Sequence, residues 1–473
     1  MKFYLFIYLL AHAHALTQIV TNHIPCTYAV KEVMKKGGNV VDGAITAVLC
    51  EGVLGPQDTG IGGGFVGVFK IGKTLKMINA REVSPASLTS VDLMRYKKHG
   101  NAGVPGMIHG MDKLHKTYGK TAWKNLFEPV ISLCKEGLPF RNYKHLFDLI
   151  TYYGFYNLID SQSSIIINKP LCRTLEKISK YGPDYFYTHI AKGIIRDLEG
   201  RSYLTEKDFK SYSSKFQEPS IGFYNNYKFI STTYPGPGKQ LIKTITDILK
   251  NKTDFIGNID KFYKNNYKER YQKYVNITGH HPVRRDLHNI HGTSNICVKH
   301  NNDGICITST VNQYFGTRFY SPSTGVILNN QLNDLPGYYK ILKPGTTPPT
   351  SASITLMLNK DKLTFLVGGT GGDRIPAGVL NVINYVLNEK MTLKSSIKMK
   401  RLYFFNNTLE IEKCFDFWNC NKQDLIVNKL LKKSKVKHPK LIKTVRYGYN
   451  TVTGIYNTES VCDPRRGGLG LRF

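Results

Sequence analysis

The chain has 473 residues, 41% of them apolar, and is therefore long enough to bury a large core in one or two domains. Lys and Arg number 65 against 34 Asp and Glu, a net charge of +31, but they are spread along the whole chain. The one dense basic run, residues 432–440, lacks the interleaved aromatic side chains of a nucleic-acid surface. The composition excludes a disordered chain and argues against nucleic acid as a partner, and it leaves adhesion to polyanions as an alternative.

The first fifteen residues have the pattern of a secretory signal peptide. Met1-Lys2 is followed by the apolar residues 3–10, and Ala13-His14-Ala15 places small residues at positions −3 and −1 of a cleavage site. The apolar run is far shorter than the roughly 20 residues that span a bilayer. We therefore expect a signal peptide at residues 1–15 and a secreted, extracellular protein, with membrane attachment only if this segment is retained as an anchor.

Export would permit disulfides and N-glycosylation. The nine cysteines cannot all pair within one chain, so at least one thiol is expected to be free or intermolecular. Cys50 and Cys134 lie in apolar helical patterns and are expected to be buried thiols, whereas Cys414 and Cys420 flank an aromatic loop and could bridge. No CxxC pair is present, and no metal site is expected. Candidate glycosylation sites are Asn251, Asn276 and Asn406.

The first third of the chain predicts two helices and two strands around a glycine-rich loop. Apolar residues recur at helical spacing over residues 26–36 and 40–54, and the loop at residues 58–64 leads into strands at 65–71 and 75–79. The loop matches neither a P-loop nor a dinucleotide fingerprint, so we interpret it as close packing beneath a site. Helical patterns then dominate residues 106–250, and residues 251–289 are polar and only weakly periodic.

At Thr293 the period of the pattern changes to two, which predicts a β-hairpin. Residues 293–300 and 305–311 alternate as strands, with a turn at Asn302-Asp303-Gly304. The numbers of cross-strand partners then add up to about 605, which places Thr293 near Thr310 and Asn312. Taken alone, this cluster is more typical of a polar strand edge than of an active site.

Several long blocks of the sequence closely resemble γ-glutamyltranspeptidases, which are N-terminal-nucleophile hydrolases. In chain order they read GGNVVDGAITAVLCEGVLGPQDTGIGGGF, INAREVSPAS, AGVPGMIHGMDKLHKTYGK, FEPVISLCKEGLPF, HGTSNICV, ITSTVNQYFGTRFYSPSTGVILNNQLNDL, VGGTGGDRIP and DPRRGG. The resemblance covers most of the chain and fades at about residues 142–169 and 251–289, where this chain is shorter than its relatives.

The resemblance implies an α+β fold, a four-layer αββα sandwich whose precursor cuts itself into two interleaved subunits. The cut would fall between Gly292 and Thr293, giving a large subunit of residues 16–292 and a small catalytic subunit of residues 293–473. His291 stands where relatives often have a small residue, and it is either tolerated or modulates the cut.

The chemistry of Thr293 explains why such a cut would be needed. A threonine hydroxyl is a weak nucleophile unless a base takes its proton, and a free α-amine, with a pKa of about 7.7–8.0, is such a base. The amide nitrogen of an uncut chain is not. The precursor should therefore be inactive, and Thr293 should combine nucleophile and base after cleavage.

The resemblance also assigns a pocket for the γ-glutamyl group, which carries an α-carboxylate and an α-ammonium. Arg81 would bind the carboxylate together with Thr350 and Ser351, and Asp334 would bind the ammonium with Gln331 beside it.

The remaining assignments concern the reacting end. Thr310 would hydrogen-bond at the nucleophile, and Asn312 would contact the amino-acid end of the substrate. The backbone N–H groups of Gly371 and Gly372 would bind the oxyanion of an acyl transfer.

Together these residues predict a γ-glutamyltransferase or glutathione hydrolase. Thr293 would take the acyl group from glutathione or another γ-glutamyl compound and pass it to water, an amino acid or a dipeptide, without a cofactor. Two alternatives remain: a secreted, inactive homologue that acts as a binding or interaction protein, and an acylase of the same fold that acts on another amide.

Overall fold

The computed structural model describes residues 16–251, 254–278, 291–335, 342–405, 408–413, 420–434, 440–442 and 450–473. The expected signal peptide, Cys414, Asn406 and part of the basic run therefore lie outside the described residues. Of the other two glycosylation candidates, Asn251 is exposed and Asn276 belongs to a helix of which only the backbone is described there.

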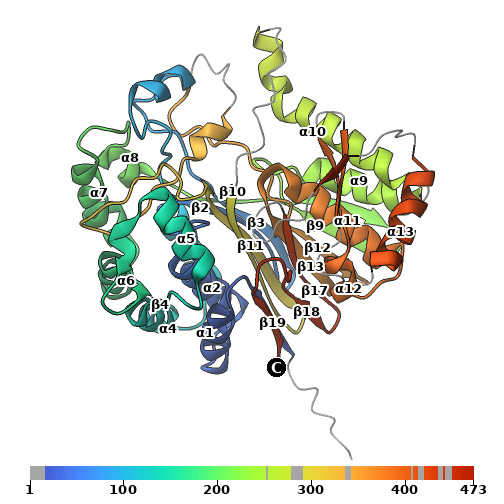
Figure 1. Ribbon diagram of the computed structural model, residues 1–473, viewed down its shortest axis with the longest axis horizontal. Helices are drawn as coiled ribbons and strands as arrows, with labels where there is room; N and C mark the ends of the chain where they lie inside the picture. Colours follow the sequence, from blue (N-terminus) through green and yellow to red (C-terminus); the bar gives the residue numbers. More distant parts are fainter. Residues whose placement is uncertain are drawn as a thin grey trace, which may run out of the picture.

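Two β-sheets lie face to face at the centre of the molecule (Figure 1). The first has the order β19 (Leu469–Arg472), β1 (Thr17–Thr21), β10 (His291–His300), β11 (Asp303–Gln313), β2 (Gly64–Ile71), β3 (Thr74–Ala80) and β7 (Lys215–Gln217). The second has the order β18 (Glu459–Val461), β17 (Thr451–Tyr456), β13 (Lys362–Thr370), β12 (Thr355–Asn359), β9 (Tyr227–Ser231) and β8 (Ser220–Tyr224). Their inner faces share one apolar core, with Val68 and Cys306 from the first sheet and Leu356 and Leu366 from the second.

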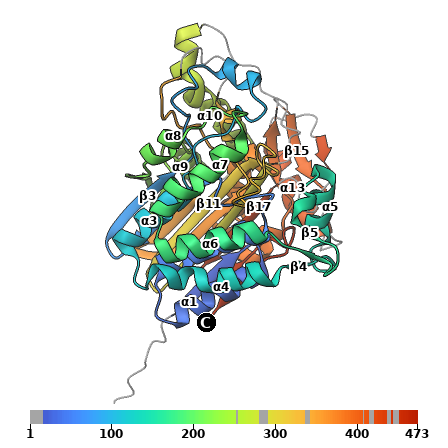
Figure 2. The same ribbon diagram turned by 90° about the vertical axis from the view of Figure 1, so that its left-hand side faces the viewer.

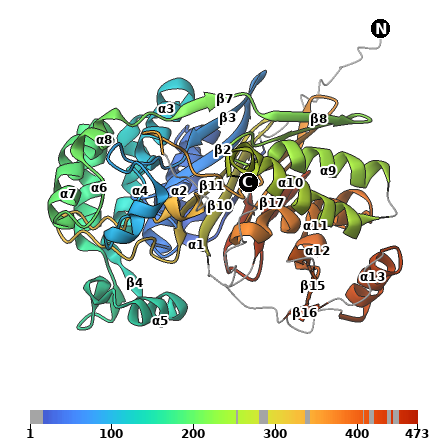
Figure 3. The ribbon, with the colours of Figure 1, turned by 90° about the horizontal axis from the view of Figure 1, so that it is seen from above.

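Helices cover the outer face of each sheet. On the first lie α1 (Ile24–Lys35), α2 (Val40–Leu54), α3 (Met107–Tyr118), α4 (Trp123–Glu136), α5 (Lys144–Tyr153), α6 (Lys169–Tyr181), α7 (Ala191–Leu198) and α8 (Glu206–Ser211). On the second lie α9 (Gly238–Lys250), α10 (Phe255–Thr278), α11 (Ile375–Leu387), α12 (Leu393–Lys398) and α13 (Cys420–Lys432). Figures 1 and 3 show the two helical groups on opposite sides of the sheets, the predicted αββα arrangement.

Two small sheets complete the fold at its edges. One has the order β14 (Leu402–Phe405), β15 (Thr408–Glu412) and β16 (Lys440–Ile442), and the other β4 (Leu138–Pro139), β6 (Ile165–Ile166) and β5 (Ile159–Asp160). Figure 2 shows β4, β5 and α5 together beside the first group of helices. Nowhere in the described ranges is a helix both long and apolar enough to cross a membrane.

Each large sheet takes strands from both sides of Gly292. Strand β1 lies between β10 and β19, and β9 of the N-terminal part pairs with β12 of the C-terminal part. A cut at Gly292 would therefore leave two chains that share both sheets, because their separation would break ladders within each sheet.

Most of the predicted elements are confirmed, and the exceptions have a common cause. Helix α2 has the predicted bounds, and α1, β2 and β3 differ from prediction by one or two residues at their ends. Helices dominate residues 106–250, as predicted, but this range also contains the six short strands β4 to β9. Residues 255–278 form α10 despite their weak periodicity. Tertiary pairing decides such segments more than local pattern.

The hairpin is confirmed, with its turn earlier than predicted. The loop is Asn301-Asn302, with Asn301 in the left-handed region at φ 54°, and the partners from Ser294↔Ser309 to His300↔Asp303 add up to 603 rather than about 605. This register puts Cys297 directly opposite Cys306, where they form a disulfide.

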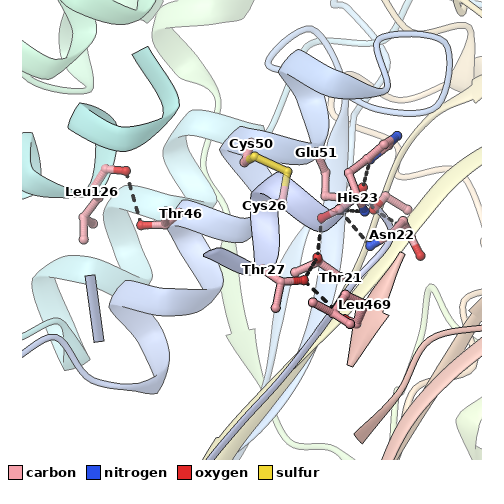
Figure 4. The surroundings of a disulfide bond; sticks show 11 residues. Thr21, Asn22, His23, Cys26, Thr27, Thr46, Cys50, Glu51, Leu126 and Leu469 are labelled. Carbon is pink, nitrogen blue, oxygen red and sulfur yellow. Dashed lines mark hydrogen bonds and ion pairs between the residues drawn. A yellow bond between two sulfur atoms is a disulfide. The ribbon is translucent and has the colours of Figure 1, made fainter. Parts of the chain in front are cut away.

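The expectation that Cys50 and Cys134 are buried thiols is wrong. Cys50 is bonded to Cys26, which joins α2 to α1 (Figure 4), and Cys134 of α4 is bonded to Cys172 of α6. In each pair the Cα atoms are 5.5–5.7 Å apart, a spacing set by how the helices pack and not by their own sequences.

The remaining cysteines agree with the prediction as far as they are described. Cys420 is in a disulfide. Cys414, which was predicted as a possible partner, lies outside the described residues. Cys462 is free, as the odd number of cysteines requires of at least one.

Candidate active site

Thr293 lies opposite a bulge in the hairpin. Gly292 is opposite Asn312 and Ser294 is opposite Ser309, so the single residue Thr293 on β10 faces two residues, Thr310 and Val311, on β11. It is buried, with 5% of its surface exposed, and its hydroxyl donates a hydrogen bond to the Gly292 carbonyl oxygen at 2.6 Å. The hydroxyl of Thr293 therefore lies against the carbonyl group of the peptide bond that precedes it.

Thr310 approaches the same carbonyl from the neighbouring strand. Its hydroxyl donates to the Gly292 oxygen at 2.5 Å, lies 3.4 Å from the Thr293 hydroxyl and accepts the Asn312 N–H at 2.7 Å. Asn312 has a left-handed backbone at φ 80°, and its side-chain amide donates to the Asn330 carbonyl at 3.2 Å. The predicted cluster of Thr293, Thr310 and Asn312 is therefore present, with two hydroxyls on one carbonyl oxygen.

Sterics explain the glycine before the threonine. A Cβ atom on Gly292 would lie 2.4 Å from the Gln57 carbonyl oxygen and 2.8 Å from the Asp58 Cα. Both contacts are with backbone, which cannot move aside as a flexible side chain can. Only glycine lets β10 run this close to the loop at residues 57–58.

A buried network next to Thr293 fixes the start of β10. The Ser294 hydroxyl donates to Glu51 Oε2 at 3.0 Å and accepts from the Asn22 amide at 2.7 Å, and Glu51 pairs with His23 at 2.9 Å. Figure 4 shows Asn22, His23 and Glu51 beside the Cys26–Cys50 disulfide. Because Cys26 is already in that disulfide, it offers no thiolate to a metal ion alongside His23 and Glu51.

Arg81 lies at the same end of the first sheet as Thr310. Thr310 on β11 is opposite Gly64 on the neighbouring strand β2. The next residue of β2, Phe65, is opposite Ala80 at the end of β3, and Arg81 directly follows Ala80. Its guanidinium is 2% exposed, and Nη2 lies 3.3 Å from Asp334 Oδ2 and donates to the Pro349 carbonyl at 3.2 Å. Arg81 thus stands between the two segments that carry its predicted partners.

The predicted partners of Arg81 lie in two segments, residues 331–334 and residues 350–351. Gln331 donates from Nε2 to Asp334 Oδ2 at 2.5 Å, and the Asp334 side chain is 26% exposed. Thr350 and Ser351, the residues after Pro349, are each 8% exposed. Arg81 and Asp334 thus place a positive and a negative group side by side, and a zwitterionic head group carries the complementary charges.

The two glycines lie at the end of β13. Gly371 and Gly372 both have left-handed backbones, at φ 110° and φ 58°, a conformation that side chains disfavour. The Ser351 hydroxyl donates to Asp373 Oδ1 at 2.5 Å, and the short 3₁₀ helix that begins at Gly372 (Gly372–Arg374) contacts β10. Ser351 is thereby tied to the short helix that follows Gly371, and this helix lies beside the strand that carries Thr293.

Sequence reasoning missed two charged residues of this region, Asp58 and Arg466. Asp58 and Arg466 form a buried ion pair, and Arg466 Nη1 also lies 3.4 Å from the Thr370 hydroxyl, next to Gly371. Burial raises the pKa of Asp58, against the opposing effects of Arg466 and of the Thr293 backbone N–H. The blocks around both residues belong to the resemblance, but no pattern in either one indicates that they meet.

Glu82 is a third missed residue. It is fully buried beside Arg81, with Oε2 3.6 Å from Nη1, and burial raises its pKa to about 7 although Arg81 opposes the shift. Its two oxygens find no hydrogen-bond donor among the described residues. Near pH 7 this side chain therefore exchanges a proton next to the predicted carboxylate-binding arginine.

Replacing Glu82 by glutamine should flatten the pH dependence of stability. The folded chain holds a proton on Glu82 between pH 4.5 and about 7 that the unfolded chain releases, so wild type loses on the order of 3 kcal/mol of unfolding free energy as the pH rises through this window. The Glu82→Gln chain should not show that loss. Urea denaturation at pH 5 and pH 8 measures the change in unfolding free energy, with the exposed Glu218→Gln as control. An equal loss in wild type and in Glu82→Gln would refute this prediction.

The fold is that of the N-terminal-nucleophile hydrolases, with two stacked sheets between helical layers, and Thr293 is buried at the predicted cut. The structure superposes on that of cephalosporin acylase from Bacillus halodurans with a TM-score of 0.78, covering 100% of this chain and 99% of the other at 17% identity, which shows the shared fold.

The chain belongs to the gamma-glutamyltranspeptidase family, whose sequence profile matches residues 26–273 and 255–471. It is 27% identical to glutathione hydrolase 2 of Arabidopsis thaliana, over 95% of this chain and 93% of the relative. It is also 27% identical to scoloptoxin SSD14 of Scolopendra dehaani, over 81% of each. The family predicted from the sequence is thus confirmed.

Proposed function

We propose that this chain is a self-cleaving γ-glutamyltransferase and glutathione hydrolase whose nucleophile is Thr293. The observation that carries the proposal is the contact of the Thr293 and Thr310 hydroxyls with the Gly292 carbonyl oxygen, at 2.6 and 2.5 Å. The short helix that begins at Gly372 contacts the strand that carries Thr293, and Arg81 follows a strand of the same sheet. Family membership and the names of the relatives support the same activity.

The cut would begin with attack by Thr293 Oγ1 on the Gly292 carbonyl carbon. A C–O bond forms, the C–N bond to Thr293 breaks, and the hydroxyl proton passes to the departing nitrogen. Water then hydrolyses the ester, which leaves a carboxylate on Gly292 and a free α-amine on Thr293. Thr310 donates to the carbonyl oxygen on which negative charge develops, as an oxyanion-hole donor does.

Turnover would use the same hydroxyl a second time. The α-amine takes the proton of Oγ1, which attacks the γ-amide carbonyl, and the Gly371 and Gly372 N–H groups stabilise the oxyanion. Arg81, Thr350 and Ser351 bind the α-carboxylate, while Asp334 and Gln331 bind the α-ammonium. The amine product leaves, and water, an amino acid or a dipeptide takes the acyl group from Thr293.

Replacing Thr310 by alanine should slow the cut by about a hundredfold, because the carbonyl of Gly292 loses its cross-strand donor. Thr310→Ser keeps the hydroxyl and is the matched control. The fraction of cut chain against time, read from denaturing gels of freshly folded protein, measures the effect. A Thr310→Ala chain that is cut as fast as Thr310→Ser would show that the donor is unimportant.

Donor specificity tests the proposed activity against an acylase with another substrate. We expect γ-glutamyl anilide to be hydrolysed at least about 100-fold more efficiently than glutaryl anilide, which lacks only the α-ammonium, because Asp334 and Gln331 would then lose their partner. Equal or faster turnover of the glutaryl compound would favour the acylase, and no turnover of either would favour an inactive binding protein.

We also propose that the protein is exported and enters an oxidising compartment. Support comes from the signal-peptide pattern of residues 1–15 and from the disulfides that join α1 to α2 and α4 to α6. Asn251 is exposed, as a glycosylation acceptor must be. Mass analysis of protein secreted from a eukaryotic host would show an N-terminus at Leu16 and any glycan.

A further inference from the structure

A buried carboxylate lies beside the nitrogen that the cut would free. Gly292 packs directly on the Asp58 backbone, and the Asp58 carbonyl accepts the Val311 N–H at 3.1 Å, so this loop is tied to both strands of the hairpin. The backbone N–H of Thr293 lies close enough to the Asp58 carboxyl to lower its pKa. The Asp58 side chain is 3% exposed.

The hydrogen bonds of this carboxylate are incomplete in the uncut chain. Oδ2 accepts from the Gln57 amide at 2.6 Å and pairs with Arg466. Oδ1 is buried, and no donor reaches it within the part of the chain that the structure describes. A buried acceptor without a donor destabilises the folded chain, so a state of the protein that supplies a donor to Oδ1 is favoured.

Cleavage would produce the missing donor in place. The amide of Thr293 has one N–H, whereas a free α-amine has two and an ammonium three. Ser294, the next residue, is held by Glu51 and Asn22, which limits how far the freed nitrogen can move from Asp58.

From this arrangement, and resting on the proposed function, we propose that Asp58 is a positioning residue that anchors the freed α-amine of Thr293 and that Arg466 balances its charge. The amine then points one lone pair at Oγ1 while its hydrogens face Asp58. No covalent step involves Asp58. When the amine takes the Oγ1 proton, the carboxylate stabilises the ammonium that forms. The positive charge of Arg466 opposes this stabilisation, so the ammonium can still give up its proton.

Arg466 is itself fixed by its neighbours. Asp463 accepts from Arg401 at 2.6 Å and from Arg465 at 3.1 Å, and both arginines are almost fully buried. This network anchors residues 463–466 against β17 through the Val452 N–H, which donates to Asp463 at 3.0 Å. The Arg466 guanidinium therefore reaches the hairpin from a rigid base.

The pH profile of kcat/KM for a γ-glutamyl anilide tests this role, because the acidic limb reports the protonation of the α-amine. Asp58→Asn should move that limb to lower pH by about one unit and lower kcat on the plateau about tenfold, since the ammonium loses its partner. Arg466→Gln should move it to higher pH by about one unit. Rates are taken per cut chain, counted on a denaturing gel. Glu218→Gln, which removes a carboxylate from the surface, should leave the limb in place.

Opposite shifts from the two halves of one ion pair are the supporting result, because general structural damage would not reverse its sign. Limbs that stay within 0.2 unit of wild type would overturn the proposal. If the Asp58→Asn chain is not cut, the pH limb of Arg466→Gln alone decides. If neither variant is cut, the ion pair acts in the cutting step instead, and the proposed role is overturned as well. An uncut, inactive wild type would overturn the proposed function together with this role, whereas an active wild type with unshifted variants overturns this role alone.

Discussion

Replacing Thr293 by alanine will leave a single uncut chain without measurable turnover. The substitution removes the hydroxyl that lies 2.6 Å from the Gly292 carbonyl oxygen, and with it both the attacking atom of the cut and the nucleophile of the reaction. Loss of a nucleophile typically lowers kcat by at least about 10⁴-fold. Denaturing gels and anilide release measure the two effects on one sample.

Thr293→Ser is the matched control for this experiment. It keeps the hydroxyl and loses only a methyl group, so it should be cut and active, although more slowly. A Thr293→Ala chain that is cut between residues 292 and 293, or that turns over substrate, would refute the assignment of Thr293. An uncut Thr293→Ser chain would show that the methyl group, too, is required for the geometry of the bulge.

Replacing Arg81 by alanine will raise KM strongly while leaving the cut in place. The guanidinium contacts Asp334 and the Pro349 carbonyl and is the one predicted partner of the substrate α-carboxylate that carries a positive charge. Losing a buried, charge-assisted contact of this kind costs about 3 kcal/mol, which is on the order of a hundredfold in kcat/KM. Among the described residues, no hydrogen bond or ion pair joins Arg81 to Thr293 or Gly292, so the yield of cut chain should change little.

Arg81→Lys separates charge from geometry in the same assay. Lysine keeps the positive charge but cannot bind a carboxylate through two parallel N–H groups, so it should recover only part of the loss. If Arg81→Ala lowered kcat with KM unchanged, Arg81 would act on the reaction and not on binding. If it abolished the cut, the pocket and the hairpin would be coupled more tightly than their contacts indicate.

The sequence predicted the elements whose patterns are local and missed those fixed by packing. Helix α2 shows this, because its apolar run and its glycine stop are both local signals. The strands β7, β8 and β9 are only three to five residues long, and they form by pairing: β7 with β3, β9 with β12, and β8 with β9. The disulfide partners of Cys50 and Cys134 depend on which helices lie side by side, information that helical periodicity does not hold.

The candidate site shows the same division. The predicted register of the hairpin placed Thr310 and Asn312 near Thr293. The predicted sum of partner numbers was about two too high, so this register did not pair Cys297 with Cys306. The assignments of Arg81, Asp334 and Gly371 came from family resemblance, and the structure brings Arg81 Nη2 within 3.3 Å of Asp334 Oδ2. Asp58 and Arg466 are about 400 residues apart in the chain, and only the fold brings them together beside Thr293.

The central claim is that this chain cuts itself before Thr293 and then works through that residue. Intact mass and a denaturing gel of the secreted protein test it most directly, together with release of a chromogenic amine from a γ-glutamyl anilide. We predict two chains that begin at Leu16 and at Thr293, and turnover that rises with the fraction of cut protein. One uncut chain that releases no amine would contradict the account and point to an inactive homologue.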